Sequence, residues 1–174
     1  MSDDPVDPAQ LPPCDLLFAE GGSLTTLPKT LERLSVPELA DVPLFLHVDF
    51  LQGLAKDDDA VHYLAALPRV NGIISVNARL LTLARKAGLL TVLRIFLQDS
   101  RSVGRGLKMV RSCRPNAVEI LPAVAGIDVI DDFRSLGIPL LASGLLRDHA
   151  TCERVLAAGF DAISASSHDI LRSA

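Results

Sequence analysis

Seven short apolar runs recur along the chain with helix-like stretches between them, and this alternation limits the fold more than any other feature. The runs are CDLLFAE (14–20), PLFLHVDF (43–50), NGIISVN (71–77), LLTVLRIFL (89–97), NAVEILPA (116–123), IPLLASG (138–144) and FDAISAS (160–166). Helical spacing of apolar residues follows in stretches such as 78–87 and 150–158, the second opened by the capping candidate Asp148 and closed by Gly159. Repeated strand-then-helix units predict a parallel sheet with right-handed crossovers.

Side-chain alternation within these runs favours a barrel over an open, doubly wound sheet. Central strands of a doubly wound sheet are covered by helices on both faces, where a charge in mid-strand is costly. Here Arg94 and Glu119 lie in mid-strand between apolar neighbours, and His47 shares one face of its run with Asp49. This pattern predicts an α/β protein with a parallel (β/α) barrel, TIM-barrel-like. Because the chain offers seven strands where eight are usual, barrel closure is left open.

Length and composition indicate one domain. The chain has 174 residues, 49% of them hydrophobic, which is enough for a sizeable core but short of the roughly 250 residues of a complete barrel. Residues 1–13 are rich in Pro and Asp and predict a disordered or degenerate N-terminal arm, so we assign a single βα-barrel domain to residues 14–174. No apolar run approaches the roughly 20 residues that cross a bilayer, and the first residues are acidic, so we expect a cytoplasmic protein without membrane contact.

The three cysteines do not suggest a metal site. Cys14, Cys113 and Cys152 are widely spaced, are odd in number and form no CxxC pair. Neither a disulfide framework nor a zinc site is therefore indicated, and we expect reduced thiols. We expect no metal and no cofactor.

Basic residues concentrate in the middle of an acidic chain. The net charge is −4, yet residues 60–118 hold ten Lys or Arg residues and one acidic residue, out of 17 and 21 in the whole chain. A helix expected over 101–114 would present one basic stripe. The stripe consists of Arg101, Arg105 and Lys108, with Arg111 at its edge. Such a stripe can follow an RNA backbone, and the alternative is an ordinary solvated helix face.

Ionisable side chains from three runs are expected to meet at the barrel mouth, where the carboxyl ends of the strands lie. They are His47, Asp49, Arg94 and Glu119, with Ser75 and Asn77 expected on the matching face of a fourth strand. Such a cluster suits a small polar ligand. The alternative is a buried ion network in which Arg94 neutralises Asp49 and Glu119. The sequence offers no paired nucleophile and base, so we identify no catalytic residues. An enzyme would need an acid-base pair, which only His47 with Glu119 could supply.

Small and hydroxyl residues follow the last two runs. They are Ala142-Ser143-Gly144-Leu145 and Ser164-Ala165-Ser166-Ser167. Loops at these positions of a βα barrel commonly hold a phosphate through backbone amides and hydroxyls. Ser143, Gly144, Ser166 and Ser167 are therefore candidates for phosphate binding, with plain turns as the alternative.

Four motifs stand in one order along the chain. They are FLHVDFLQGL (45–54), GIIS (72–75), RIFLQDS (94–100) and VEILP (118–122). Together with a similarity that continues from 139 to 167, they resemble the glycerol uptake operon antiterminator family, whose members respond to glycerol-3-phosphate. The resemblance implies a regulator that binds glycerol-3-phosphate and a leader mRNA and lets polymerase read through a terminator ahead of glycerol uptake and utilisation genes. It also implies that the ligand is lined by His47, Asp49, Gln52, Arg94 and Glu119, and that its phosphate is held by Gly144, Ser166 and Ser167.

An enzyme is the alternative to this regulator, such as a phosphosugar isomerase or a glycerol-phosphate-utilising transferase, because a barrel fold alone does not choose a function.

Three departures from the family pattern bear on the ligand response. No counterpart of the family's first strand precedes Cys14, Val76 and Asn77 follow Ser75 where a basic residue is common, and Ser143 replaces the first of two glycines. We therefore expect the fold to be kept with its first βα unit missing or degenerate, while these departures leave open whether the ligand response is kept, altered or lost. A homo-oligomer is left open.

Overall fold

The structure is a computed structural model that describes Pro8, residues 11–167 and Ile170. The strands are β1 (Leu17–Glu20), β2 (Leu44–His47), β3 (Gly72–Ser75), β4 (Leu90–Phe96), β5 (Ala117–Leu121), β6 (Leu140–Ser143) and β7 (Ala162–Ser164). The helices are α1 (Leu27–Arg33), η2 (Pro37–Leu39), α2 (Asp58–Ala65), α3 (Ala78–Lys86), α4 (Ser100–Cys113), α5 (Ala123–Gly126), η3 (Ile127–Val129), α6 (Ile130–Arg134) and α7 (His149–Ala157). None of these described helices combines the length and the apolar character needed to cross a membrane.

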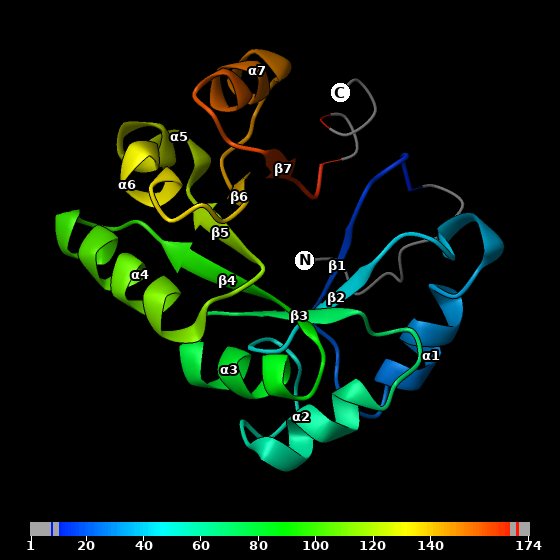
Figure 1. Cartoon of the computed structure of the whole chain (residues 1–174). Coiled ribbons are helices and arrows are strands. Elements are labelled where there is room, and N and C mark those ends of the chain that lie inside the picture. Colours follow the sequence, from blue (N-terminus) through cyan, green and yellow to red (C-terminus); the bar gives the residue numbers. More distant parts are fainter. Residues whose placement is uncertain (1–7, 9–10, 168–169, 171–174) are drawn as a thin grey trace.

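All seven strands are parallel, and their order in the sheet is their order in the chain, from β1 to β7. A doubly wound sheet would reverse its strand order at a switch point, so this sequential order confirms the TIM-barrel-like prediction. The sheet curls, with the helices on its outer side (Figure 1). Within the described residues the ladder runs from β1 to β7 and is not closed by pairing between these two strands.

Two apolar layers follow from the alternation of side chains along the strands. Outward-facing residues of the strands, such as Leu46, Leu93 and Ile120, pack with the helices in the larger cluster. The inward face carries a smaller cluster that includes Phe45 and Val92. Because the apolar packing of the inner face is confined to this cluster, the inner face is free to carry polar groups further along the strands.

Acidic side chains cap three of the helices. The carboxylates of Asp57, Asp99 and Asp148 each accept a hydrogen bond from the backbone N–H three residues further on, at the starts of α2, α4 and α7. A cap of this kind satisfies an amide that the helix itself leaves unpaired. The cap at Asp148 confirms the predicted start of α7, and the helix expected over 101–114 is α4, which begins and ends one residue earlier.

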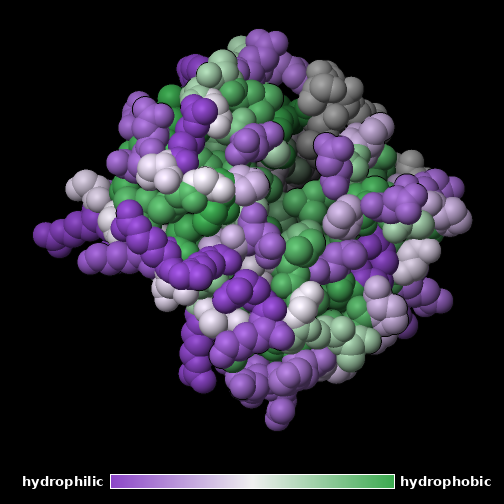
Figure 2. Space-filling model, in the orientation of Figure 1, coloured by the Kyte–Doolittle hydropathy of each residue, from purple (hydrophilic) through white to green (hydrophobic). Residues whose placement is uncertain are grey.

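The predicted N-terminal arm, residues 1–13, falls mostly outside the described residues, so its disorder stays a prediction. In the described part of the chain, β1 is the first strand, and it occupies the end of the first apolar run. Hydrophilic side chains project from the surface over α3 and α4 (Figure 2). This surface carries the basic residues considered below.

Candidate functional site

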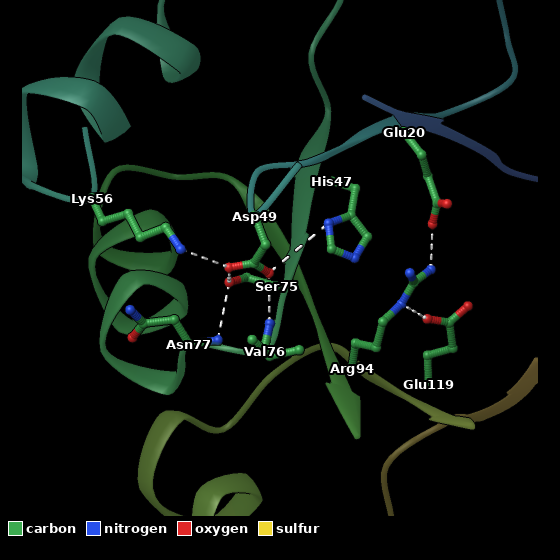
Figure 3. Close-up of polar contacts among 9 residues, drawn as sticks. All are labelled: Glu20, His47, Asp49, Lys56, Ser75, Val76, Asn77, Arg94 and Glu119. Atoms are coloured by element: carbon green, nitrogen blue, oxygen red, sulfur yellow. Dashed lines mark hydrogen bonds and ion pairs between the residues drawn. The ribbon is translucent and has the colours of Figure 1, made fainter. Parts of the chain in front are cut away.

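An ion cluster on the inner face of the sheet joins the carboxyl end of β1 to the interior of β4 and β5 (Figure 3). The Arg94 guanidinium donates from Nε to Oε2 of Glu119 at 2.5 Å and from Nη2 to Oε1 of Glu20 at 2.5 Å. The Glu119 side chain is fully buried and the Arg94 side chain is 7% exposed, whereas the Glu20 side chain is 37% exposed. One buried cation therefore faces two carboxylates, one of which reaches solvent.

The strand register explains this meeting. Arg94 pairs with Glu119 across β4 and β5, and Glu20 pairs with His47 across β1 and β2, so each pair projects from the same face. Burial opposes the charge of Arg94, but the hydrogen bond and charge of Glu119, with those of Glu20, raise its pKa overall. The guanidinium therefore stays charged at neutral pH.

His47 is buried beside this cluster with its ring nitrogens unused. Its ring stacks on Phe50 with 4.3 Å between centroids, and neither nitrogen has a hydrogen-bond partner among the described residues. The 3.9 Å from Nδ1 to Oδ2 of Asp49 is too long for a hydrogen bond. Burial and the nearby charge of Arg94 lower the pKa of His47 below its ordinary value, so the ring is neutral near pH 7. Oε1 of Glu119 is likewise buried without a partner in this part of the chain.

Asp49 holds two loops together rather than joining the Arg94 cluster. Its carboxylate accepts hydrogen bonds from the Ser75 hydroxyl at 3.1 Å and the Val76 backbone N–H at 2.8 Å, and Lys56 lies 3.5 Å away. In the alternative ion network Arg94 would neutralise Asp49 and Glu119, whereas in the structure the carboxylates bound to Arg94 are Glu119 and Glu20. The expected face of Ser75 was also wrong, because Ile74 is the residue that pairs with His47.

Gln52 connects the first two strand-to-helix loops through its backbone. Its N–H donates to the carbonyl of Gly22, and its own carbonyl accepts from the N–H of Leu24. The side chain is exposed and has no hydrogen-bond partner among the described residues. A ligand contact at Gln52 stays a prediction.

The predicted phosphate loops follow β6 and β7. Ser143 is buried at the end of β6 and pairs with Ser164 of β7, which brings the two loops side by side. Gly144 has φ +73°, a left-handed conformation that favours glycine. Ser166 and Ser167 are exposed after β7. The start of α7 is already capped by an aspartate, so a phosphate here would use the residues of these loops instead of that helix end.

The predicted basic stripe lies on the outer face of α4. The side chains of Arg101, Arg105, Lys108 and Arg111 are all exposed. Arg105 lies 3.8 Å from Asp99, in an exposed ion pair worth little to stability. The neighbouring helix α3 adds exposed Arg79, Arg85 and Lys86. The helix and its exposed cations are confirmed, whereas RNA contact is not tested by these positions.

Glu20 is the site residue that the sequence reasoning missed. It ends the first apolar run and lies two residues after Phe18, whose ring contacts Phe45 on the inner face. That spacing places Glu20 on the inner face at the carboxyl end of its strand, which is the same signal that identified the other site residues.

Comparison with known proteins places the chain in a family. The uncharacterized protein YgcP of Escherichia coli strain K12 is 27% identical over 154 residues, covering 88% of this chain and 79% of YgcP. The structure is similar to that of a glycerol uptake operon antiterminator regulatory protein from Listeria monocytogenes, with a TM-score of 0.82, 23% identity and coverage of 92% of this chain and 85% of that chain. For a glycerol uptake operon antiterminator-related protein from Thermotoga maritima, the TM-score is 0.80 and the identity 26%, over 91% of this chain and 88% of that chain. A family model described as glycerol-3-phosphate responsive antiterminator matches residues 3–171. The chain therefore belongs to the glycerol-3-phosphate responsive antiterminator family.

Proposed function

We propose that this protein binds glycerol-3-phosphate at the mouth of its barrel and binds a leader mRNA, so that transcription continues into glycerol uptake and utilisation genes. Family membership supports the ligand class. The observation that carries the proposal for this chain is the set of buried polar atoms without partners at the mouth, the two nitrogens of His47 and Oε1 of Glu119. Leaving such atoms unpaired costs about 1–3 kcal/mol each, and a polyol can supply their hydrogen bonds.

The charges of the site determine which end of glycerol-3-phosphate lies beside the carboxylates. Glu20 and Glu119 outnumber Arg94, so a phosphate dianion beside them would be repelled. The glycerol hydroxyls can donate to these carboxylates and to a neutral His47. The phosphate then extends towards Ser143, Gly144, Ser166 and Ser167 in the loops after β6 and β7, the usual phosphate position in such barrels.

The RNA-binding half of the proposal depends on the exposed cations of α3 and α4. Residues 60–118 contain one acidic residue against ten basic ones, so an RNA backbone meets little repulsion there. The stripe of Arg101, Arg105, Lys108 and Arg111 runs along one helix face. Acidic residues elsewhere would keep RNA from other faces of the molecule.

Thermal unfolding with and without glycerol-3-phosphate tests the ligand. At a concentration about 100 times its dissociation constant, a ligand that binds only the folded protein adds about 2.7 kcal/mol. For a chain of this length that raises Tm by about 5–10 °C. Glycerol and inorganic phosphate are the control compounds. Glu20→Gln should reduce the increase, and Glu32→Gln, an exposed acid on α1, is the matched control.

Two results would contradict the proposal of a regulator that binds glycerol-3-phosphate. One is an unchanged Tm with millimolar glycerol-3-phosphate in a folded sample. The other is consumption of glycerol-3-phosphate by the pure protein, which would favour an enzyme over a regulator.

The salt dependence of leader-RNA binding tests the second half. Replacing Arg101, Arg105 and Lys108 together by Ala should weaken binding and reduce the log-log salt slope by roughly 0.7–0.9 for each lost phosphate contact. The variant should stay folded, because these side chains are exposed. Equal affinity and slope in the triple variant would mean that the stripe is an ordinary solvated face.

A further inference from the structure

A groove opens where β3 stops short of its neighbour. The pairing of β3 with β4 ends at Ser75 and Leu93, whereas β4 continues to Phe96 beside β5. The groove of about 160 Å³ lies between this free stretch of β4, the turn after β3 and the part of α4 between positions 102 and 109. A cavity of only about 10–15 Å³ can hold a single buried water, so the groove can take a larger group.

The lining of the groove is apolar on one side and basic at its rim. Phe96 is 45% exposed and Val76 38% exposed, although both are large apolar side chains. Met109 adds a third apolar wall, and Arg105 lies at the rim. Gly106 lies on the α4 side, where an added Cβ would come within 2.9 Å of Ile95, so α4 packs directly on β4 and keeps the lining in place.

The charge around the groove selects its occupant. The rim is continuous with the exposed cations of α4, and Asp99 is the single acidic residue between positions 60 and 118. An aromatic face next to an arginine suits an unpaired base with its phosphate, because the base stacks on the ring and the phosphate meets the cation. An apolar segment of a protein partner would use the wall but not the cations of α4, among which Arg105 has only an exposed ion pair with Asp99 at 3.8 Å.

We propose that this groove between β4 and α4 binds one unpaired base of an RNA, stacked on Phe96, with the adjoining phosphate on Arg105. The inference rests on the proposed RNA-binding function and adds to it the position and chemistry of base recognition. It also connects RNA with ligand, since Arg94 borders the groove and holds the carboxylates of the barrel mouth.

Fluorescence can test the contact directly, because the chain contains no tryptophan. Phe96→Trp keeps an aromatic face in the groove and introduces a single tryptophan, whose emission can be excited apart from that of the one tyrosine. Tyr63→Trp, on α2 and 43% exposed, is the matched control. A single-stranded RNA of about twelve nucleotides should quench the tryptophan at 96 and leave the one at 63 unchanged. A blunt RNA duplex of similar length should quench neither, because its bases are paired.

Affinity gives an independent result. Phe96→Ala should bind the single strand about 5- to 150-fold more weakly, the fold-change that corresponds to one stacked base, and should bind the duplex as the wild type does. If Phe96→Ala binds the single strand as tightly as the wild type, the groove is not the base site, although RNA binding by the stripe would stand. If the wild type binds neither RNA at low salt, the proposed RNA-binding function fails and the groove proposal fails with it.

Discussion

Replacing Arg94 by methionine would leave a carboxylate with no counter-ion at the centre of the protein. The Glu119 side chain is fully buried and the Arg94 side chain is 7% exposed, so neither charge is compensated by water. Removing one partner of such a buried pair costs about 3–5 kcal/mol, because the other charge stays desolvated. Glu20 contributes less to this loss, since its side chain is 37% exposed and regains water. We therefore expect Arg94→Met to lose about 3–5 kcal/mol of unfolding free energy.

The double variant Arg94→Met with Glu119→Met separates charge from packing. Replacing both members of a buried pair by apolar residues of similar volume is often neutral or stabilising, so the double variant should recover most of the loss. Urea unfolding monitored by far-UV circular dichroism measures the free energies, provided that the slopes agree among the variants. The recovered variant should not respond to glycerol-3-phosphate, because the mouth would have lost two of the three charged groups of its cluster, keeping only Glu20. A loss below about 1 kcal/mol in Arg94→Met, or a double variant less stable than the single one, would refute this reasoning.

Two further predictions concern pH and packing. Because the pKa of His47 is lowered in the folded protein, the unfolded state binds the proton first as pH falls below the ordinary value of 6.5. The free energy of unfolding, which is at its full value above that pH, should therefore decline on acidification. In urea unfolding, His47→Gln should reduce this decline between neutral and mildly acidic pH. In α4, an added Cβ meets nothing at Gly104 but comes within 2.9 Å of Ile95 at Gly106, so Gly106→Ala should be about 1–3 kcal/mol less stable than Gly104→Ala; equal thermal stabilities would contradict this.

The fold could be predicted because each strand carries its own information about its two faces. Alternation around Arg94 and Glu119 showed that both strands have an apolar and a polar face, and the parallel order of the strands then placed these two side chains together. Alternation failed at Asp49, because β2 ends at His47 and the chain turns before Asp49. A period of two residues holds only while the backbone stays extended, so the side chain of Asp49 points to the next loop instead.

The relative register of neighbouring strands is the information that alternation lacks. In β3 the residues from Gly72 to Ile74 are all apolar or glycine, so the pattern does not say which of them share the face of His47. The same limit applies to the groove beside Phe96, which exists because β3 ends before β4 does. How far two strands stay paired depends on how both segments pack together. The sequence of one apolar run does not contain that information.

Arg94 makes a coupling between ligand and RNA physically reasonable in this chain. Its guanidinium holds Glu20 and Glu119 at the mouth, and the same residue borders the groove that ends in Phe96. A polyol that donates a hydrogen bond to the free Oε1 of Glu119 would share that carboxylate with Arg94, which is bound at Oε2, and so favour another arrangement of Arg94 on β4. Coupling free energies are typically about 1–3 kcal/mol and act equally in both directions. A single-stranded RNA that stacks on Phe96 must therefore change the affinity for glycerol-3-phosphate by the same factor by which glycerol-3-phosphate changes the affinity for that RNA.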